Sequence, residues 1–336
     1  METTMRSLLL AVLLTLAALP SQARPFTDMA GRQIDIPAHP HRIFPAVTSV
    51  TVTLAALAPD LLVGLAFDLP EGAAGFLPPE LARLPVVRVL ESLDGERILA
   101  TAPDLVVGWH GITQARAETV MARIGKPLLL VEGEVLARHP ATFRLLGAAL
   151  GRGERAEALA RYLEDSQARL AAALAGLPDE ARPRVYYAES PDGLTTQCSA
   201  STRLEVIRLA GGRPALECPG GGLSHSQQVD METLLALDPD VILARDRRTA
   251  EQLAARPLWQ KLRAVREGRL YASPTLPFNW FDRPPSFMRA LGAQWLARLL
   301  HPTRFHTPIH VEARRFNELF FGVTPPEDAL HRMLAP

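Results

Sequence analysis

Short, continuous apolar runs alternate with amphipathic segments along most of the chain. The apolar runs lack the strict alternation of a half-exposed strand, so they predict strands covered on both faces, as in parallel sheets packed between helices. These strands are predicted at residues 42–47, 61–66, 86–89, 105–107, 127–131, 184–189, 241–243 and 269–272. Helices are predicted at residues 49–58, 113–124, 202–210, 249–255, 257–265, 286–300 and 310–321, with a hairpin at 26–32. The predicted fold class is α/β with mainly parallel sheets.

One helix–strand corner occurs twice, at residues 92–108 and 229–244. The copies, 136 positions apart, share an Asp that can cap the helix, a Pro that ends it and an apolar run that begins the next strand. The identical pairs are Asp94/Asp230, Glu96/Glu232, Leu99/Leu235, Ala100/Ala236, Pro103/Pro239 and Asp104/Asp240. Such corners also recur by chance in α/β proteins, but the agreement in order and spacing favours two related Rossmann-like lobes.

Residues 154–176 form the longest uninterrupted helical pattern, rich in Ala, Leu, Glu and Arg. A helix of that length spans about 33 Å. Because it lies midway between the two copies, we interpret it as a helix that bridges the lobes rather than an ordinary core helix. The predicted domains are an N-terminal lobe at 24–140, a bridging helix at 141–177, a C-terminal lobe at 178–300 and a helical tail at 301–336.

The first 23 residues follow the order of a secretory signal peptide. A short segment containing Arg6 is followed by an apolar run at residues 7–19 and by small residues that end at Ala23. The run is short of the ~20 residues that span a bilayer, which argues against a membrane anchor. No Cys follows it, so no lipid-attachment site is visible. We predict cleavage near Ala23 and export to the periplasm.

Charge and cysteine content narrow the class of protein further. Acidic and basic residues balance at 36 each, which gives no basic surface for nucleic acid. The two cysteines, Cys198 and Cys218, predict a disulfide in an exported protein, worth ~3 kcal/mol for a loop of about 20 residues; two free thiols are the alternative. We expect a monomer with no intrinsic cofactor.

Motifs of common enzyme classes are absent: the sequence has no G-x-G-x-x-G, no P-loop, no G-x-S-x-G and no H-E-x-x-H. We place a ligand cleft between the lobes, beyond the carboxyl ends of the strands. Residues 132–133, 189–190 and 245–247 also stand at such ends. Arginines bind oxygen anions and aromatic rings stack, so the lining suits a bulky, partly aromatic or anionic ligand. The predicted lining is Thr48, Ser49, Phe67, Trp109 and His110 from the first lobe, and His225, Arg247, Phe278, Trp280 and Phe281 from the second.

Several segments, taken together and in order, resemble one family of transport proteins. They are residues 26–32, 46–49, 92–109, the 154–176 helix, 209–212, 229–243 and 265–272. The family is that of the periplasmic binding proteins of ABC importers for iron–siderophore complexes, haem and cobalamin. The resemblance implies two α/β lobes joined by one long helix, no catalysis, and delivery of a ligand to an inner-membrane permease.

The resemblance also assigns a role to the acidic residue of each repeat. In that family each lobe presents a surface Glu to arginines on the permease, and the matching positions are Glu96 and Glu232. The alternative is that both residues only complement the helix dipole, since an acid in a first turn contributes ~0.3–1 kcal/mol. We expect docking to be their main function.

The resemblance bears on the ligand as well. In binders of catecholate siderophores, a His in the loop before the second repeat can ligate the metal, and His225 falls there. Arg203 and Arg247 match anion-binding positions, but the metal-ligating Tyr has no counterpart within residues 278–281. An iron–siderophore-type chelate is the expected ligand, with haem, cobalamin, a nickel or other small chelate, or an oxyanion as alternatives.

A different class of function remains open from the residues alone. An exported metal-dependent enzyme or a metallochaperone could use His110 and His225, if the two face each other across the cleft. Bare-metal sites normally supply three or four protein ligands, and only these two can be nominated. We therefore favour a binding protein that captures a metal–organic complex.

Overall fold

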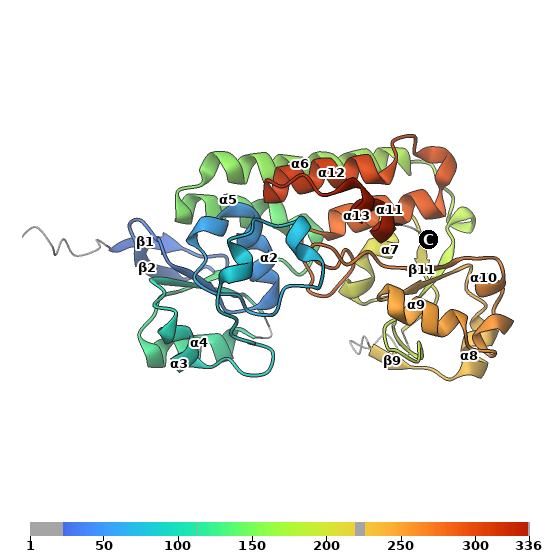
Figure 1. Cartoon of the computed structure of the whole chain (residues 1–336), viewed down its shortest axis with the longest axis horizontal. Helices are drawn as coiled ribbons and strands as arrows, with labels where there is room; N and C mark the ends of the chain where they lie inside the picture. Colours follow the sequence, from blue (N-terminus) through green and yellow to red (C-terminus); the bar gives the residue numbers. More distant parts are fainter. Residues whose placement is uncertain (1–22, 112, 219–225, 335–336) are drawn as a thin grey trace, which may run out of the picture.

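The computed structural model describes residues 23–111, 113–218 and 226–334. The predicted signal peptide, apart from Ala23, and the predicted ligand residue His225 lie outside these ranges. Within them, no helix is both long and apolar enough to cross a membrane. The described chain forms two α/β lobes side by side under a layer of helices (Figure 1), which confirms the predicted fold class.

The N-terminal lobe is built on a parallel sheet in the order β3-β4-β5. Its strands are β3 (Ile43–Pro45), β4 (Leu105–Trp109) and β5 (Leu128–Val131), preceded by the hairpin β1 (Ala23–Thr27) and β2 (Gln33–Pro37). Its helices are α2 (Thr48–Leu57), α3 (Gly95–Ala100) and α4 (Gln114–Ile124), with single 3-10 turns η1 (Pro59–Leu61), η2 (Ala73–Gly75), η3 (Leu81–Arg83) and η4 (Leu136–Arg138). Thr27 pairs with Gln33, so the predicted hairpin is confirmed.

The C-terminal lobe contains a parallel sheet in the order β11-β10-β6-β8 and a small antiparallel pair, β7-β9. Its strands are β6 (Arg184–Ala188), β7 (Thr195–Gln197), β8 (Arg213–Pro214), β9 (Ser226–Gln228), β10 (Val241–Ala244) and β11 (Leu270–Ala272). Its helices are α7 (Glu205–Leu209), α8 (Met231–Leu237), α9 (Arg247–Ala254) and α10 (Arg263–Arg266), with 3-10 turns η5 (Asp179–Ala181), η6 (Thr202–Leu204) and η8 (Trp259–Lys261).

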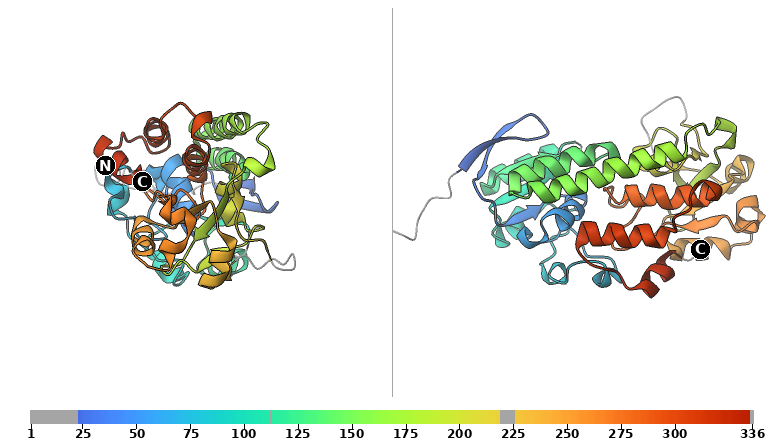
Figure 2. Two further views of the ribbon diagram at one scale, coloured as in Figure 1. Left: turned by 90° about the vertical axis from the view of Figure 1, so that its right-hand side faces the viewer. Right: turned by 90° about the horizontal axis from the view of Figure 1, so that it is seen from above.

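A layer of long helices joins the two lobes. It consists of α5 (His139–Leu150), α6 (Gly153–Ala173), α11 (Arg289–Leu300), the turn η9 (Pro302–Arg304), α12 (Ile309–Phe321) and α13 (Glu327–Leu334). The predicted bridging helix is confirmed as α6, which runs along the top of both lobes with α12 beside it (Figures 1 and 2). The C-terminal tail also returns to the N-terminal lobe, where Asn317 Nδ2 donates to the carbonyl of Phe76 at 2.9 Å.

Both sheets are covered on both faces, as their unbroken apolar runs predict. On β10, Val241 and Leu243 pack into a central core shared with the helical layer, while Ile242 points to a separate core on the other face. Strand β4 does the same, with Leu105 in the central core and Val106 in a satellite core. The central core therefore continues from one lobe into the other.

The two repeated corners begin with the same capping interaction. The Asp94 carboxylate accepts the backbone N–H groups of Glu96 and Arg97 at 3.0 and 3.2 Å. The Asp230 carboxylate accepts the N–H of Thr233 at 2.7 Å. Each cap satisfies donors that the first turn of a helix leaves unpaired, so both short helices start where the sequence predicts.

The second Asp of each corner ties the corner to the neighbouring strand. The Asp104 carboxylate accepts the N–H of Arg42 at 3.1 Å, just before β3. In the other lobe the Asp240 carboxylate accepts the N–H of Arg184, at the start of β6, at 2.8 Å. The predicted repeat is therefore reproduced at the level of individual hydrogen bonds.

Backbone conformation repeats too. Ala102 has φ 49° and Asp238 has φ 37°, and these residues are 136 positions apart. Left-handed conformations are costly for residues other than Gly, Asn and Asp. Their occurrence at the equivalent position of both corners shows that the tight turn before Pro103 and Pro239 is a shared feature of the two lobes.

Two predicted strands are shorter than expected. Residues 61–66 and 86–89 form only isolated bridges, Ile43 with Leu62 and Leu65 with Val86. Pro85 has no N–H and cannot extend the ladder, although its carbonyl accepts the N–H of Leu65 at 2.9 Å. The predicted helix at 257–265 is likewise broken into η8 and α10, and α13 was not anticipated.

The predicted disulfide between Cys198 and Cys218 is confirmed, with an S–S distance of 2.07 Å. It joins the end of β7 to the segment after β8, across a sequence separation of 20. Reduction is expected to lower the free energy of unfolding by ~3 kcal/mol, because the open loop gains entropy in the unfolded chain. Urea denaturation with and without dithiothreitol measures this, with the Cys198→Ser, Cys218→Ser double variant as control. Equal stability in both buffers would contradict the prediction.

Candidate functional site

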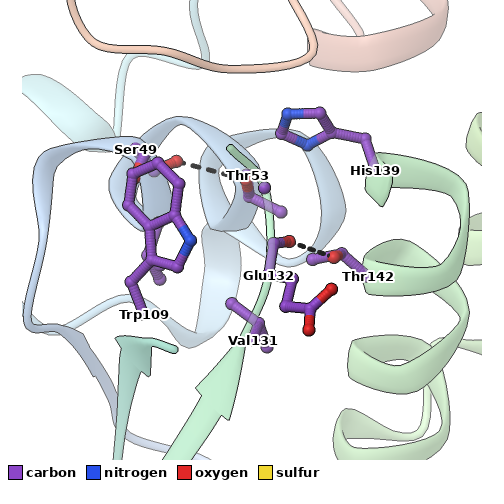
Figure 3. A pocket seen from close by; sticks show the side chains of 9 residues that line it. Ser49, Thr53, Trp109, Val131, Glu132, His139 and Thr142 are labelled. Carbon is purple, nitrogen blue, oxygen red and sulfur yellow. Dashed lines mark hydrogen bonds between the residues drawn. The ribbon is translucent and has the colours of Figure 1, made fainter. Parts of the chain in front are cut away.

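A small, partly open pocket lies in the N-terminal lobe (Figure 3). It lies at the carboxyl ends of β4 and β5, beside the start of α2, where a ligand is expected in a parallel α/β lobe. Its volume is about 10 Å³. Its lining residues are Ser49, Val50, Thr53, Trp109, Val131, Glu132, Gly133, His139 and Thr142.

The first turn of α2 borders this pocket without a side-chain cap. Val47, at the N-cap position, is extended, and no side chain bonds the first-turn N–H groups. These groups have no partner within a helix, and the helix dipole makes them attractive to negative charge. Ser49 and Val50, in this turn, are both buried and both line the pocket.

His139 closes the pocket from the opposite side. Its side chain is 1% exposed, and neither ring nitrogen has a hydrogen-bond partner among the described residues. Burial, aided by the positive charge of Arg289, lowers the pKa of His139 to about 3, and the backbone of Gly133 opposes this shift only in part. The imidazole is therefore neutral at physiological pH, with one N–H to donate and one nitrogen to accept. In Figure 3 its ring stands across the pocket from Trp109, with Thr53 between them.

The C-terminal lobe contributes a cluster of arginines at the matching strand ends. Glu189, directly after β6, accepts a hydrogen bond from Arg203 Nη1 at 2.8 Å, and its same oxygen is paired with Arg283. Arg245, directly after β10, donates to the Glu189 carbonyl at 3.5 Å. Arg203 and Arg283 have side chains 44% and 49% exposed, while Glu189 is buried. Two half-exposed guanidiniums thus share one carboxylate, while Arg245 is paired with the Asp246 carboxylate at 2.9 Å.

A buried acid lies behind the arginines. The Asp282 carboxylate accepts a hydrogen bond from the Tyr187 hydroxyl at 2.7 Å, and its second oxygen lies 3.8 Å from Arg283 Nε. Burial raises the pKa of Asp282 and, together with that carboxylate, the pKa of Tyr187. Asp282 is 2% exposed, so it lies beneath the arginine cluster rather than on its surface.

Buried hydrogen bonds, called the latch below, tie the loop next to the pocket to the lobe that carries the arginine cluster. Arg289 of α11 donates through Nη1 to the Glu134 carbonyl at 2.6 Å and to the Glu205 carboxylate at 3.0 Å. Glu205 also accepts the N–H of Leu136 at 3.0 Å. Thr202, next to Arg203 in the chain, bonds the Glu134 carboxylate at 2.6 Å. The loop after β5 is therefore fastened to the C-terminal lobe beside the cluster.

Comparisons with known proteins give the family. A family model described as "Periplasmic binding protein" matches residues 76–275. A solved ABC transporter solute binding protein from Sulfurospirillum deleyianum is 31% identical, covers 92% of this chain and 98% of its own, and superposes with a TM-score of 0.83. The chain belongs to the periplasmic binding protein family. Members of this family bind solutes and are not enzymes.

Relatives of this binding protein are named for different ligands. A vitamin B12-binding protein of Salmonella typhimurium is 28% identical over 64% of this chain and 76% of its own length. The molybdate-binding protein MolA of Haemophilus influenzae is 24% identical over 90% of this chain and 92% of its own length. The structure of MolA bound to molybdate shares the fold, with a TM-score of 0.76. The family is thus compatible with more than one ligand class.

The described cleft contains part of the predicted lining. Ser49 and Trp109 line the pocket, Thr48 begins α2 next to it, and Arg203 belongs to the arginine cluster. Phe67 is half-buried, with its ring 6.0 Å from that of Phe278. Among the ranges that the structure covers, no group of three His, Cys, Asp or Glu side chains could hold a metal ion.

The remaining predicted lining residues lie elsewhere. Phe278, Trp280 and Phe281 are buried in the core of this binding protein, so the predicted ligand contact is corrected: these side chains present no surface to the cleft. His110 is exposed and bonded through Nδ1 to Gln114, and does not line the pocket. Arg247 donates to the Arg332 carbonyl in α13 at 2.9 Å. The aromatic and basic residues at these positions therefore have structural contacts within the protein, and a ligand is not needed to explain them.

Four site residues escaped the sequence interpretation in part or entirely. Glu189 and Arg245 were recognised only as residues at strand ends, and Arg283 not at all. His139 begins α5 before a Pro, where a His usually reads as a solvated helix start. No local signal distinguishes a buried His, because its burial depends on Phe287 of a distant segment, whose ring lies 6.2 Å away.

The two predicted docking residues are exposed on equivalent helices. Glu96 lies in the first turn of α3 and Glu232 in the first turn of α8, and both helices lie along the edge opposite α6 in Figure 1. One turn further, Leu99 is 45% and Leu235 37% exposed. Each lobe of this binding protein therefore presents the same pair of an acid and an exposed leucine.

Proposed function

We propose that this binding protein captures an anionic metal complex with oxygen atoms on its outside, such as an iron–siderophore-type chelate or a metal oxyanion. It acts in the periplasm, without an intrinsic cofactor and as a monomer, and hands its ligand to an ABC-transporter permease. The observation that carries the proposal is the arginine cluster, in which Arg203 and Arg283 share the carboxylate of Glu189. Partly exposed guanidiniums beside a cleft favour oxygen anions through paired N–H groups.

The family relationship supports the transport part of this proposal. The relatives include solute-binding proteins named for ABC transporters, vitamin B12 and molybdate. Vitamin B12 is the second candidate because of the B12-binding relatives, and Trp109 offers a flat apolar surface beside the pocket. The enzyme and metallochaperone alternatives have less support, since His110 is held by Gln114 outside the pocket.

The docking part of the proposal rests on Glu96 and Glu232. Neither carboxylate enters a described ion pair, both are exposed, and both are presented by capped helices of equal design. Their exposure in both lobes suits salt bridges to basic residues on the permease, with Leu99 and Leu235 adding apolar contact.

Single substitutions in the arginine cluster test the ligand class. Arg203→Gln and Arg283→Gln are each expected to weaken binding of sodium molybdate or ferric tris-catecholate about tenfold or more, because a hydrogen bond to a charged group contributes ~1.5–3 kcal/mol. Affinity for cyanocobalamin, which presents mainly amides, is expected to change little. Calorimetric titration of both variants and the wild-type protein measures these affinities.

The matched control is Arg161→Gln, an exposed arginine on α6 whose ion pair among the described residues is with Glu157. It is expected to bind as the wild-type protein does. The ligand class is wrong if the wild-type protein binds cyanocobalamin and neither anionic complex, or if the cluster variants bind an anionic complex as tightly as Arg161→Gln.

A further inference from the structure

Two independent features converge on the pocket of the N-terminal lobe. One is the uncapped first turn of α2, whose residues Ser49 and Val50 line the pocket. The other is His139, which is buried and whose ring nitrogens make no hydrogen bond of good geometry with the described residues, although the Gly133 backbone lies close enough to favour its charged form. They come from helices far apart in sequence, yet both border the same small space (Figure 3).

A buried imidazole without partners is costly, because burial removes its hydrogen bonds to water. In folded proteins such groups are nearly always satisfied, and the exceptions call for an explanation. The ring of His139 packs edge-on against Phe287, with the ring centres 6.2 Å apart and an angle of 81° between the planes. An atom that enters the pocket can satisfy it.

The size of the pocket limits what that atom can be. Its volume of about 10 Å³ holds roughly one atom the size of a water oxygen. The pocket communicates with the cleft, so a larger ligand outside it can insert a single atom. Charge favours an anionic atom, since the N-terminus of a helix attracts negative charge. The one carboxylate of the lining, Glu132, is paired with Arg138, whose Nε donates to it at 2.5 Å.

We propose that this pocket binds one terminal, negatively charged oxygen of the captured ligand, with the first-turn N–H groups of α2 and the neutral ring of His139 as donors. The inference rests on the proposed function and deepens it, because it assigns the ligand two separate groups of binding residues. The arginine cluster of the C-terminal lobe binds it through charge, and the α2 pocket selects one oxygen through size and hydrogen bonding.

The proposal separates oxygen from other acceptors. A sulfur atom is a weaker hydrogen-bond acceptor than oxygen, so the donors around the pocket favour oxygen. The wild-type protein is therefore expected to bind molybdate more tightly than tetrathiomolybdate, by tenfold or more. The imidazole donates in its neutral form, so the discrimination is expected to stay constant between pH 5 and pH 8.

Two substitutions at His139 test the donor role. His139→Phe keeps a buried ring without N–H groups, and is expected to weaken binding of sodium molybdate or ferric tris-catecholate, whichever the wild-type protein binds more tightly, by 10- to 100-fold. His139→Gln retains a donor and is expected to stay within about threefold of the wild-type affinity. His301→Phe is the control, because His301 is also buried but bonds the Gly211 carbonyl at 3.2 Å. It is expected to leave affinity unchanged.

A second readout follows the ring directly. The ¹⁵N resonances of His139 are expected to shift on titration with the same complex, whereas a merely structural role leaves them unchanged. If His139→Phe binds like the wild-type protein, or the resonances do not move, the pocket holds only water and the inference is wrong while the proposed function stands. If the wild-type protein binds neither complex, both are overturned.

Discussion

Alanine at both Glu96 and Glu232 is expected to abolish delivery of the ligand to the membrane while ligand affinity stays at the wild-type value. Both carboxylates are exposed, and neither residue lines the pocket of the N-terminal lobe. The capping residues Asp94 and Asp230 remain, so α3 and α8 keep their first turns. Ligand-dependent ATPase activity of the permease in lipid nanodiscs, at limiting permease, measures the loss.

The control for this experiment is Glu154→Ala. Glu154 is likewise exposed in the first turn of a helix, but on α6, at the opposite edge of the molecule. The Glu154→Ala variant loses a favourable interaction with a helix dipole, worth ~0.3–1 kcal/mol, but this residue lies outside the proposed docking surface. Full ATPase stimulation by the double variant would contradict the docking proposal. Each single variant is expected to retain part of the stimulation, because the other lobe still engages.

Methionine in place of Arg289 is expected to lower the free energy of unfolding by ~3–5 kcal/mol. Arg289 is 1% exposed and donates to the carbonyls of Glu134 and Phe281 and to the carboxylate of Glu205. Removal of one member of a buried ion pair leaves the other charge uncompensated, which is the source of the large effect. Urea denaturation followed by circular dichroism measures the difference.

Arg298→Met supplies a matched comparison on the same helix. Arg298 donates to the carbonyls of Thr307 and Gln294 and does not reach across to the N-terminal lobe. Its loss is expected to cost about 1 kcal/mol. Similar losses for the two variants would show that the latch between the lobes contributes little. NMR titration gives a second readout: without the positive charge of Arg289 nearby, the pKa of His139 is expected to rise from about 3.

The sequence predicted the elements that depend on local signals. The cap, the Pro and the apolar run that define each corner act within about fifteen residues, and the structure reproduces both corners down to the hydrogen bonds of Asp104 and Asp240. The long helix α6 is similarly specified by its own composition. Strands β4 and β10 could be recognised because helices cover both faces of each sheet, which makes every residue of these strands apolar.

The candidate site was predicted less well because its exposure depends on distant packing. Residues 278–281 look like a cleft loop, but the ring of Phe281 packs 4.5 Å from that of Tyr187 and Trp280 donates to the Leu276 carbonyl at 2.7 Å. Arg247 contacts α13, a helix that the pattern did not reveal. In each case the deciding contact joins segments whose proximity is set only by the assembled fold.

The paired left-handed residues, Ala102 and Asp238, carry a consequence for the partner. A turn that recurs with its unusual backbone, its cap and its exposed acid points to descent from an internal duplication, after which the ligand walls diverged. Each lobe then offers the same pair of an exposed acid and an exposed leucine at the edge of the molecule opposite α6. A membrane partner assembled from two identical chains would meet the same small surface on each of its halves, while the asymmetric cargo lies between them.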